Sequence, residues 1–167
     1  MNEIKGVVLH WDGGQPKSIE ALQRWLRKHG NGRGYHRYIK GNNVVYGADT
    51  RKKQIHCGAY SYTHPAVRYF GAYCPDWNHK EKPHKNSPNN CTIGICMLHD
   101  YDGGKYSNET LLTSAKISAQ MLSYYDLNIN GLWTHHMVTG KSCPKFFVDH
   151  PEQWEVFKDM VNHYIGG

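Results

Sequence analysis

The chain has 167 residues, a length that fits one domain with its own apolar core. Hydrophobic residues make up 39% and charged residues 20% of the sequence, which is typical of a folded globular protein and excludes an intrinsically disordered chain. The formal net charge of +6 favours an acidic partner, such as nucleic acid, an anionic membrane face or an acidic cell-wall polymer. Because the basic residues are scattered and no nucleic-acid motif occurs, we expect no nucleic-acid partner.

Cysteine usage and the N-terminus bear on the compartment. The five cysteines are an odd count without paired CxxC knuckles, which argues against both a disulfide framework and a zinc ribbon and favours a reducing compartment. The first nine residues hold too short an apolar run for a secretory signal, and no stretch approaches the roughly 20 apolar residues of a membrane span. We therefore expect synthesis in the cytoplasm without a signal peptide, and no membrane insertion.

Residues 4–10 are predicted to form a short buried strand, because an apolar run there is followed by the breaker pair Gly13 and Gly14. His10 ends this strand, where side chains of a sheet emerge into a crevice. At this point His10 is equally well explained as a metal ligand or as a ring bonded to a neighbouring carbonyl.

A helix over residues 19–29 and a hairpin are predicted next. Ser18 can cap this helix, and its apolar stripe is Ile19, Leu22, Trp25, Leu26 and His29. The hairpin pairs residues 35–39 with residues 44–46 across a Gly-Asn-Asn turn, so that Tyr35 and His36 begin its first strand.

The middle of the chain is less regular. His56 lies beside Cys57 without the spacing of a zinc knuckle, so we treat Cys57 as structural. Residues 71–90 are interrupted by prolines and rich in basic residues, which predicts a long polar loop. Such a loop can form the rim of a binding groove or a mobile insertion, and the sequence does not separate these alternatives.

The second half predicts strand, helix, strand and helix. Residues 92–98 read as a buried strand, and Ser107 caps a long helix that ends before residue 128. The apolar face of that helix is predicted to be Leu111, Leu112, Ala115, Ala119, Leu122 and Tyr125. A short strand over residues 132–134 then delivers His135 to the sheet end that carries His10. The last helix begins at Pro151, ends at Gly166 and buries Trp154, Phe157, Met160, Val161 and Tyr164. The predicted fold is a single α/β domain over residues 1–167, with a central mixed sheet flanked by helices.

Residues 134–144 combine two imidazoles, an ammonium and a thiol, and imidazole with thiolate is a ligand mixture that zinc prefers. His10, His135 and Cys143 together give three protein ligands, which leave a fourth tetrahedral position open, as in catalytic zinc sites. Adjacent strand residues face opposite ways, so only one of His135 and His136 is expected to reach the metal.

Four segments resemble the zinc-dependent N-acetylmuramoyl-L-alanine amidases of the type-2 class, which include phage lysins, bacterial autolysins and relatives of animal peptidoglycan recognition proteins. Residues 7–10 are similar to the family's first strand with its ligand His, and residues 34–36 (Gly-Tyr-His) to the segment with its catalytic Tyr. Residues 90–95 (Asn-Cys-Thr-Ile-Gly-Ile) resemble the strand lining the substrate cleft. Most specific is the run 138–144 (Val-Thr-Gly-Lys-Ser-Cys-Pro), with a His eight positions before the Cys.

The resemblance implies a zinc cofactor held by His10, His135 and Cys143, with His136 as a bystander. It implies hydrolysis of the amide between N-acetylmuramic acid and L-alanine in bacterial peptidoglycan, by a phage or prophage endolysin that reaches the wall after release. Many bacterial members carry a Glu where this chain has Cys96, so the resemblance moves the catalytic roles to Tyr35 and Lys141. Substrate contacts are expected from His36, His56 and Asn90.

The sequence leaves additional partners and two rival functions open. Anionic wall polymers are additional candidate partners, and we expect a monomer. One rival is a recognition domain that binds peptidoglycan without cutting it, although such relatives are expected to lack part of the ligand set. Another is a structural metal in a protein that binds nucleic acid, but structural zinc sites usually close with four protein ligands.

Overall fold

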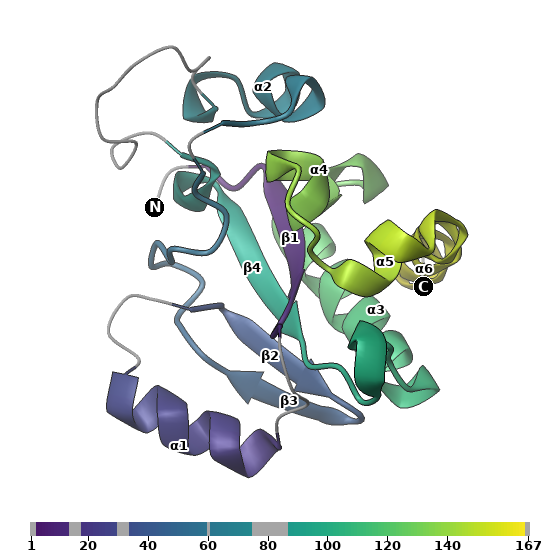
Figure 1. Cartoon of the computed structure of the whole chain (residues 1–167). Coiled ribbons are helices and arrows are strands. Elements are labelled where there is room, and N and C mark those ends of the chain that lie inside the picture. Colours follow the sequence, from purple (N-terminus) through teal and green to yellow (C-terminus); the bar gives the residue numbers. More distant parts are fainter. Residues whose placement is uncertain (1–2, 14–17, 30–33, 60, 75–86, 166–167) are drawn as a thin grey trace.

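The computed structural model describes residues 3–13, 18–29, 34–59, 61–74 and 87–165. Within them, five strands form one sheet in the order β3-β2-β4-β1-β5 (Figure 1). The strands are β1 (Gly6–Trp11), β2 (Arg37–Lys40), β3 (Asn43–Tyr46), β4 (Thr92–Met97) and β5 (Leu132–Thr134). β1 runs parallel to β4 and β5, and β2 runs parallel to β4 but antiparallel to β3. The predicted central mixed sheet is therefore confirmed.

Six α-helices flank this sheet in the described part of the chain. They are α1 (Ile19–His29), α2 (His64–Phe70), α3 (Asn108–Tyr124), α4 (His135–Thr139), α5 (Lys145–Asp149) and α6 (Pro151–Ile165). Among the described residues, no helix has the length and apolar composition needed to cross a lipid bilayer.

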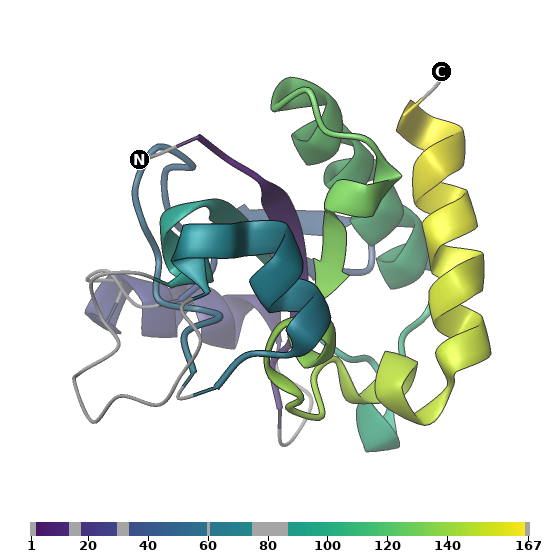
Figure 2. The same ribbon diagram turned by 90° about the horizontal axis from the view of Figure 1, so that it is seen from above.

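One face of the sheet carries the main apolar core. Alternate strand residues point to this face, among them Val7 and Leu9 of β1 and Ile93 and Ile95 of β4, all fully buried. Helices α3 and α6 lie side by side over them (Figure 2). Ser107 caps α3 as predicted, since its hydroxyl accepts a hydrogen bond from the Thr110 amide at 3.2 Å.

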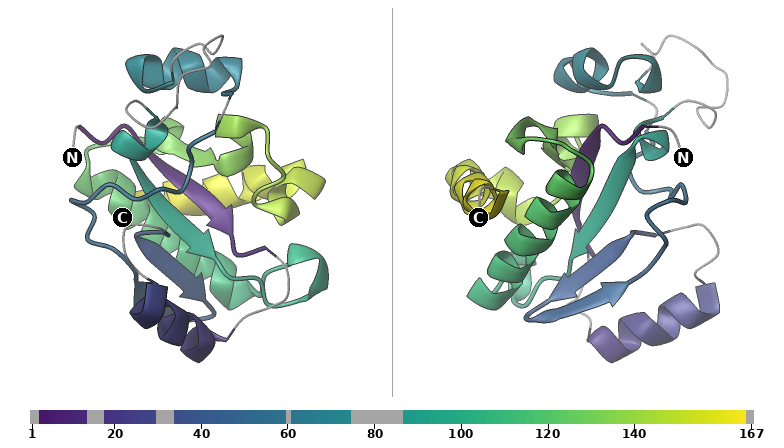
Figure 3. Two further views of the ribbon diagram at one scale, coloured as in Figure 1. Left: turned by 60° about the vertical axis from the view of Figure 1, so that its left-hand side comes forward. Right: turned by 180° about the vertical axis from the view of Figure 1, so that it is seen from behind.

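The opposite face presents Val8 and His10 of β1, and it is covered at two ends by different helices. At one end, Leu22 of α1 packs against Tyr38, Cys96 and Leu98. At the other end, α2 and α4 pack over Val8 and Trp133. Figure 3 shows α1 and α3 on opposite sides of the sheet. His10 therefore lies between the end of this face that α1 covers and the end that α2 and α4 cover, near the C-terminal end of its strand.

Several element predictions are wrong in detail. β2 begins at Arg37 rather than Tyr35: the Tyr35 amide donates to the Tyr38 hydroxyl at 3.1 Å, and the His36 amide donates to the Gly94 carbonyl of β4 at 2.9 Å. Trp25 and Leu112, predicted to lie on apolar faces, are 46% and 43% exposed.

Helices α2, α4 and α5 were not predicted, because each is too short to show a clear period. In the predicted polar loop, residues 71–73 and 88–90 form 3-10 turns, whereas residues 75–86 lie outside the described residues. Helix α6 ends at Ile165, and Gly166 lies outside the described part.

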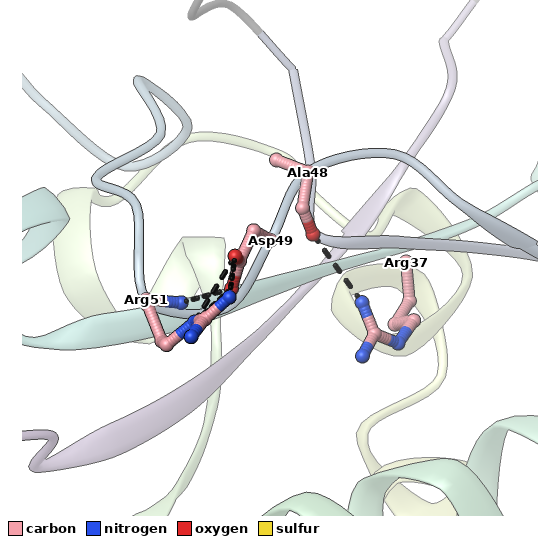
Figure 4. Close-up of polar contacts among 4 residues, drawn as sticks. All are labelled: Arg37, Ala48, Asp49 and Arg51. Atoms are coloured by element: carbon pink, nitrogen blue, oxygen red, sulfur yellow. Dashed lines mark hydrogen bonds and ion pairs between the residues drawn. The ribbon is translucent and has the colours of Figure 1, made fainter.

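The segment after β3 is tied to the start of β2 (Figure 4). The Arg37 guanidinium donates to the Ala48 carbonyl at 3.4 Å and stacks on Tyr46, 4.4 Å from the ring centroid. Asp49 accepts three hydrogen bonds from the guanidinium of Arg51, at 2.7, 3.1 and 3.1 Å. The Arg37 contacts tie the start of the segment that leads into His56 to β2, whereas the Asp49–Arg51 pair is a local contact within that segment.

Candidate metal centre

His10 and His135 are brought together by the register of two parallel strands. Leu9 of β1 pairs with Thr134 of β5, so the next residues of the two strands, His10 and His135, emerge side by side. Their ring centroids are 4.6 Å apart. His135 is the first residue of α4 rather than a strand residue, so the alternation argument for His135 over His136 does not describe its backbone.

Helix α4 returns the chain so that Cys143 faces the two histidines. The Thr134 hydroxyl caps α4 by accepting from the Met137 amide at 3.1 Å. Gly140 ends the helix at φ +76°, a left-handed conformation that favours glycine. The chain then doubles back, and the His136 amide donates to the Cys143 carbonyl at 2.7 Å.

Metal-ligating atoms of His10, His135 and Cys143 all lie within 4.8 Å of one another, and all three residues are buried. Cys143 Sγ is 3.8 Å from His10 Nδ1. The Nε2 atom of His135 is buried and has no hydrogen-bond partner in the described part of the chain. An orphaned imidazole nitrogen beside a thiol and a second imidazole fits a metal ion, which would satisfy it.

Burial sets the protonation of these groups. It lowers the pKa of His135 to about 4, with a further contribution from the Lys141 charge. It lowers the pKa of His10 well below its usual value, and His56, His135 and Lys141 add to that shift. Both rings are therefore neutral at pH 7, the form that binds metal. Burial also raises the pKa of Cys143 to about 11, although the Trp11 backbone and Lys141 lower it, so metal binding must displace the thiol proton.

The two predicted catalytic residues border this centre. The half-buried Tyr35 ring lies 4.7 Å from the His10 ring, centroid to centroid. Burial raises the pKa of Tyr35 above its usual value, so the hydroxyl keeps its proton at neutral pH and can donate it in a hydrogen bond. Lys141 is exposed, and its ammonium is close enough to lower the pKa of His10 and His135.

The three predicted substrate contacts are distributed differently. His36 is fully buried, and its Nδ1 accepts from the Gly94 amide at 2.9 Å while its Nε2 meets the Lys52 carbonyl at 3.0 Å. His56 is also buried, with its Nδ1 3.0 Å from His10 Nε2. His36 and His56 thus both have partners within the fold, and substrate contacts from them stay a prediction.

The sequence predicted a substrate contact from Asn90 and did not single out its neighbour Asn89. Asn90 is half-buried in a 3-10 turn. The Asn89 side chain is buried and accepts from the amides of His56 and Cys57 at 2.9 and 2.8 Å. The two consecutive asparagines are visible in the sequence, but only the fold shows that the Asn89 side chain binds the backbone at residues 56 and 57.

A cavity of about 540 Å³ adjoins the centre. Tyr35 and His56 line it on the side of the metal ligands, and Trp25, Tyr38 and Leu98 contribute apolar wall. A mostly apolar cavity next to convergent polar groups is typical of a substrate site.

Comparison of the sequence with known proteins points to one family. The family model described as N-acetylmuramoyl-L-alanine amidase matches residues 1–146. The amidase CwlL of Bacillus licheniformis is 30% identical over 82 residues, which is 49% of this chain but only 22% of that protein. This chain therefore spans about a fifth of that curated relative.

Solved structures share the fold at low sequence identity. The PlyG catalytic domain superposes with a TM-score of 0.70 at 16% identity, over 98% of this chain and 83% of that one. The Staphylococcus aureus hydrolase AmiA, solved with its ligand, gives 0.68 at 16% identity over 98% and 73% of the two chains. PlyL gives 0.65 at 16% identity over 95% and 84%. With a family match over most of its length, the chain belongs to the N-acetylmuramoyl-L-alanine amidase family.

Proposed function

We propose that residues 1–167 form one catalytic domain that uses zinc to hydrolyse the amide between N-acetylmuramic acid and L-alanine in bacterial peptidoglycan. The observation that carries this proposal is the convergence of His10, His135 and Cys143, with the His135 Nε2 atom orphaned, in a member of the amidase family. Two imidazoles and a thiolate favour zinc over the hard cations magnesium and calcium. When bound, zinc polarises a carbonyl as a Lewis acid and lowers the pKa of water.

The residues around the proposed zinc have separate tasks. The Tyr35 hydroxyl donates a hydrogen bond to the attacking water or the amide, and it relays a proton during attack. The Lys141 ammonium stabilises the negative charge that develops on the scissile carbonyl oxygen. Cys96 pairs with His10 across the sheet, at the position where the family resemblance leads us to expect a Glu, so we assign proton transfer to Tyr35 and Lys141.

The substrate class agrees with the charge of the chain. A net charge of +6 favours adsorption to anionic wall polymers, which we propose as additional partners of a monomeric endolysin. The protein is made in the cytoplasm in this scheme and acts on the wall after release. The cavity beside Tyr35 supplies an apolar surface for the peptide part of the substrate.

Product analysis tests the proposal directly. Purified protein is incubated with peptidoglycan, and the products are examined by mass spectrometry with and without a chelator. We expect new N-terminal L-alanine that disappears on chelation and returns with zinc. Binding to peptidoglycan without any cleavage, with zinc present, would instead assign the chain to the recognition domains that hold the wall intact.

A further inference from the structure

A chain of buried hydrogen bonds leads away from the proposed metal centre. His10 Nε2 lies 3.0 Å from His56 Nδ1. On its other side, His56 Nε2 lies 3.2 Å from the Thr92 hydroxyl and 3.4 Å from the Thr92 carbonyl. The Thr92 hydroxyl in turn donates to the Pro88 carbonyl at 2.6 Å. All of these groups are buried.

The direction of this chain follows from its far end. A carbonyl oxygen can only accept, so the single Thr92 hydroxyl hydrogen is committed to Pro88. The Thr92 hydroxyl and carbonyl oxygens therefore both accept from His56 Nε2, which must carry the hydrogen. A neutral imidazole has one N–H, so His56 Nδ1 accepts from His10 Nε2. The His10 Nδ1 atom then carries a lone pair that faces Cys143 Sγ, 3.8 Å away.

The fold holds the His56 ring in place with two further devices. Its backbone amide donates to the buried Asn89 side chain at 2.9 Å. Its ring lies over Gly94, where a Cβ atom would come within 2.7 Å of His56 Cγ. No ordinary side chain fits at residue 94 unless this ring moves, so the glycine makes room for His56.

We infer that His56 is a positioning residue: its Nδ1 atom accepts the His10 Nε2 hydrogen and thereby fixes His10 in the tautomer and ring orientation that present Nδ1 to the metal. The inference rests on the proposed zinc site. Metal-ligating histidines generally donate their second N–H to such a partner, and loss of that partner weakens metal affinity by about 10-fold to 100-fold.

The tautomers are measured first, on the zinc-free protein. Long-range ¹⁵N–¹H spectra of the imidazoles distinguish protonation at Nδ1 from protonation at Nε2. We expect Nε2–H on both His10 and His56 at neutral pH. A hydrogen on Nδ1 of either ring would overturn the inference, whether or not the protein binds zinc.

Zinc affinity is measured second, by competition with a chelator. In His56→Asn, the amide oxygen can occupy the place of Nδ1, whereas His56→Gln offers its polar atoms nearer the place of Nε2. We expect His56→Gln to weaken zinc binding by about 10-fold to 100-fold and His56→Asn to lose less than about 10-fold. The control is His163→Gln, which replaces an exposed imidazole on α6.

The possible outcomes separate the two proposals. Unchanged affinity in His56→Gln, or equal losses in the Asn and Gln variants, overturns the positioning role while the zinc site stands. Wild-type protein that binds no zinc overturns the proposed function, and the positioning role with it. Thermal melting of each zinc-free variant shows whether it is folded, and the wild-type tautomers decide the question if the Gln variant is not.

Discussion

Acidification of the zinc-free protein should lower its free energy of unfolding, because histidines around the metal centre are buried in the neutral form. Burial lowers the pKa of His56 to about 3 and that of His135 to about 4. In the unfolded chain both groups return to about 6.5. Between these values the unfolded state binds protons that the folded state excludes, so stability rises with pH and falls as pH decreases below about 6.5.

The magnitude follows from the size of these pKa shifts. Well below pH 6.5, each such histidine lowers the free energy of unfolding by about 1.4 kcal/mol for each pH unit of acidification. Between pH 6.5 and 4.5 this amounts to about 2 kcal/mol per histidine. His56 and His135 together therefore remove about 4 kcal/mol, and His10, whose pKa is also lowered, adds to this loss. The total free energy of unfolding of a small domain is about 5–15 kcal/mol, so this loss is large.

Urea unfolding at pH 6.5, 5.5 and 4.5 measures this loss. Chelator is present throughout, so that metal release does not contribute. In His56→Asn the loss between pH 6.5 and 4.5 should be smaller by about 2 kcal/mol, since one buried imidazole is gone. His163→Asn, which replaces an exposed ring, controls for the substitution. A wild-type free energy of unfolding that is constant within about 1 kcal/mol over this range would refute the argument.

Five substitutions extend these expectations. Lys141→Ala and Tyr35→Phe should keep zinc, measured by metal analysis, but cleave peptidoglycan about 100-fold to 1,000-fold more slowly, and near-normal rates in both would move their roles elsewhere. His135→Ala should lose zinc and activity while His136→Ala, at an exposed ring, keeps the metal; zinc retained by purified His135→Ala contradicts the ligand assignment. Ser107→Ala should destabilise the protein by about 1 kcal/mol in urea unfolding, and no change would mean that the α3 cap contributes nothing.

The sheet could be predicted from the sequence because its strands are short apolar runs bounded by turn residues. Residues 92–97 are buried throughout, and such a run is visible without knowledge of its neighbours. The five-residue helices α4 and α5 show no such period, because their positions depend on the Gly140 turn and on packing against other elements. The exposure of Trp25 likewise depends on what covers α1, which its sequence pattern does not encode.

The metal centre likewise has parts that could be predicted from the sequence and parts that could not. His10 and His135 could be proposed as neighbours because each follows an apolar strand, and parallel strands bring such ends to one edge. The partnership of His10 with His56 could not be predicted, since they lie 46 positions apart and the His56 ring occupies space that a side chain at Gly94 would fill. His56 stood out in the sequence because it lies next to Cys57 and both are possible metal ligands. Its hydrogen-bond partners in the fold are instead His10, Asn89 and Thr92.

The first and last proposed ligands, His10 and Cys143, lie 133 positions apart in the sequence. The first proposed ligand therefore lies in β1, whereas the last follows every strand that the structure describes. An N-terminal fragment shorter than 143 residues lacks the thiol, whatever part of it folds. Zinc bound to all three residues would also join β1 to the segment after α4, which closes a loop of most of the chain and restricts the separation of its two halves during unfolding.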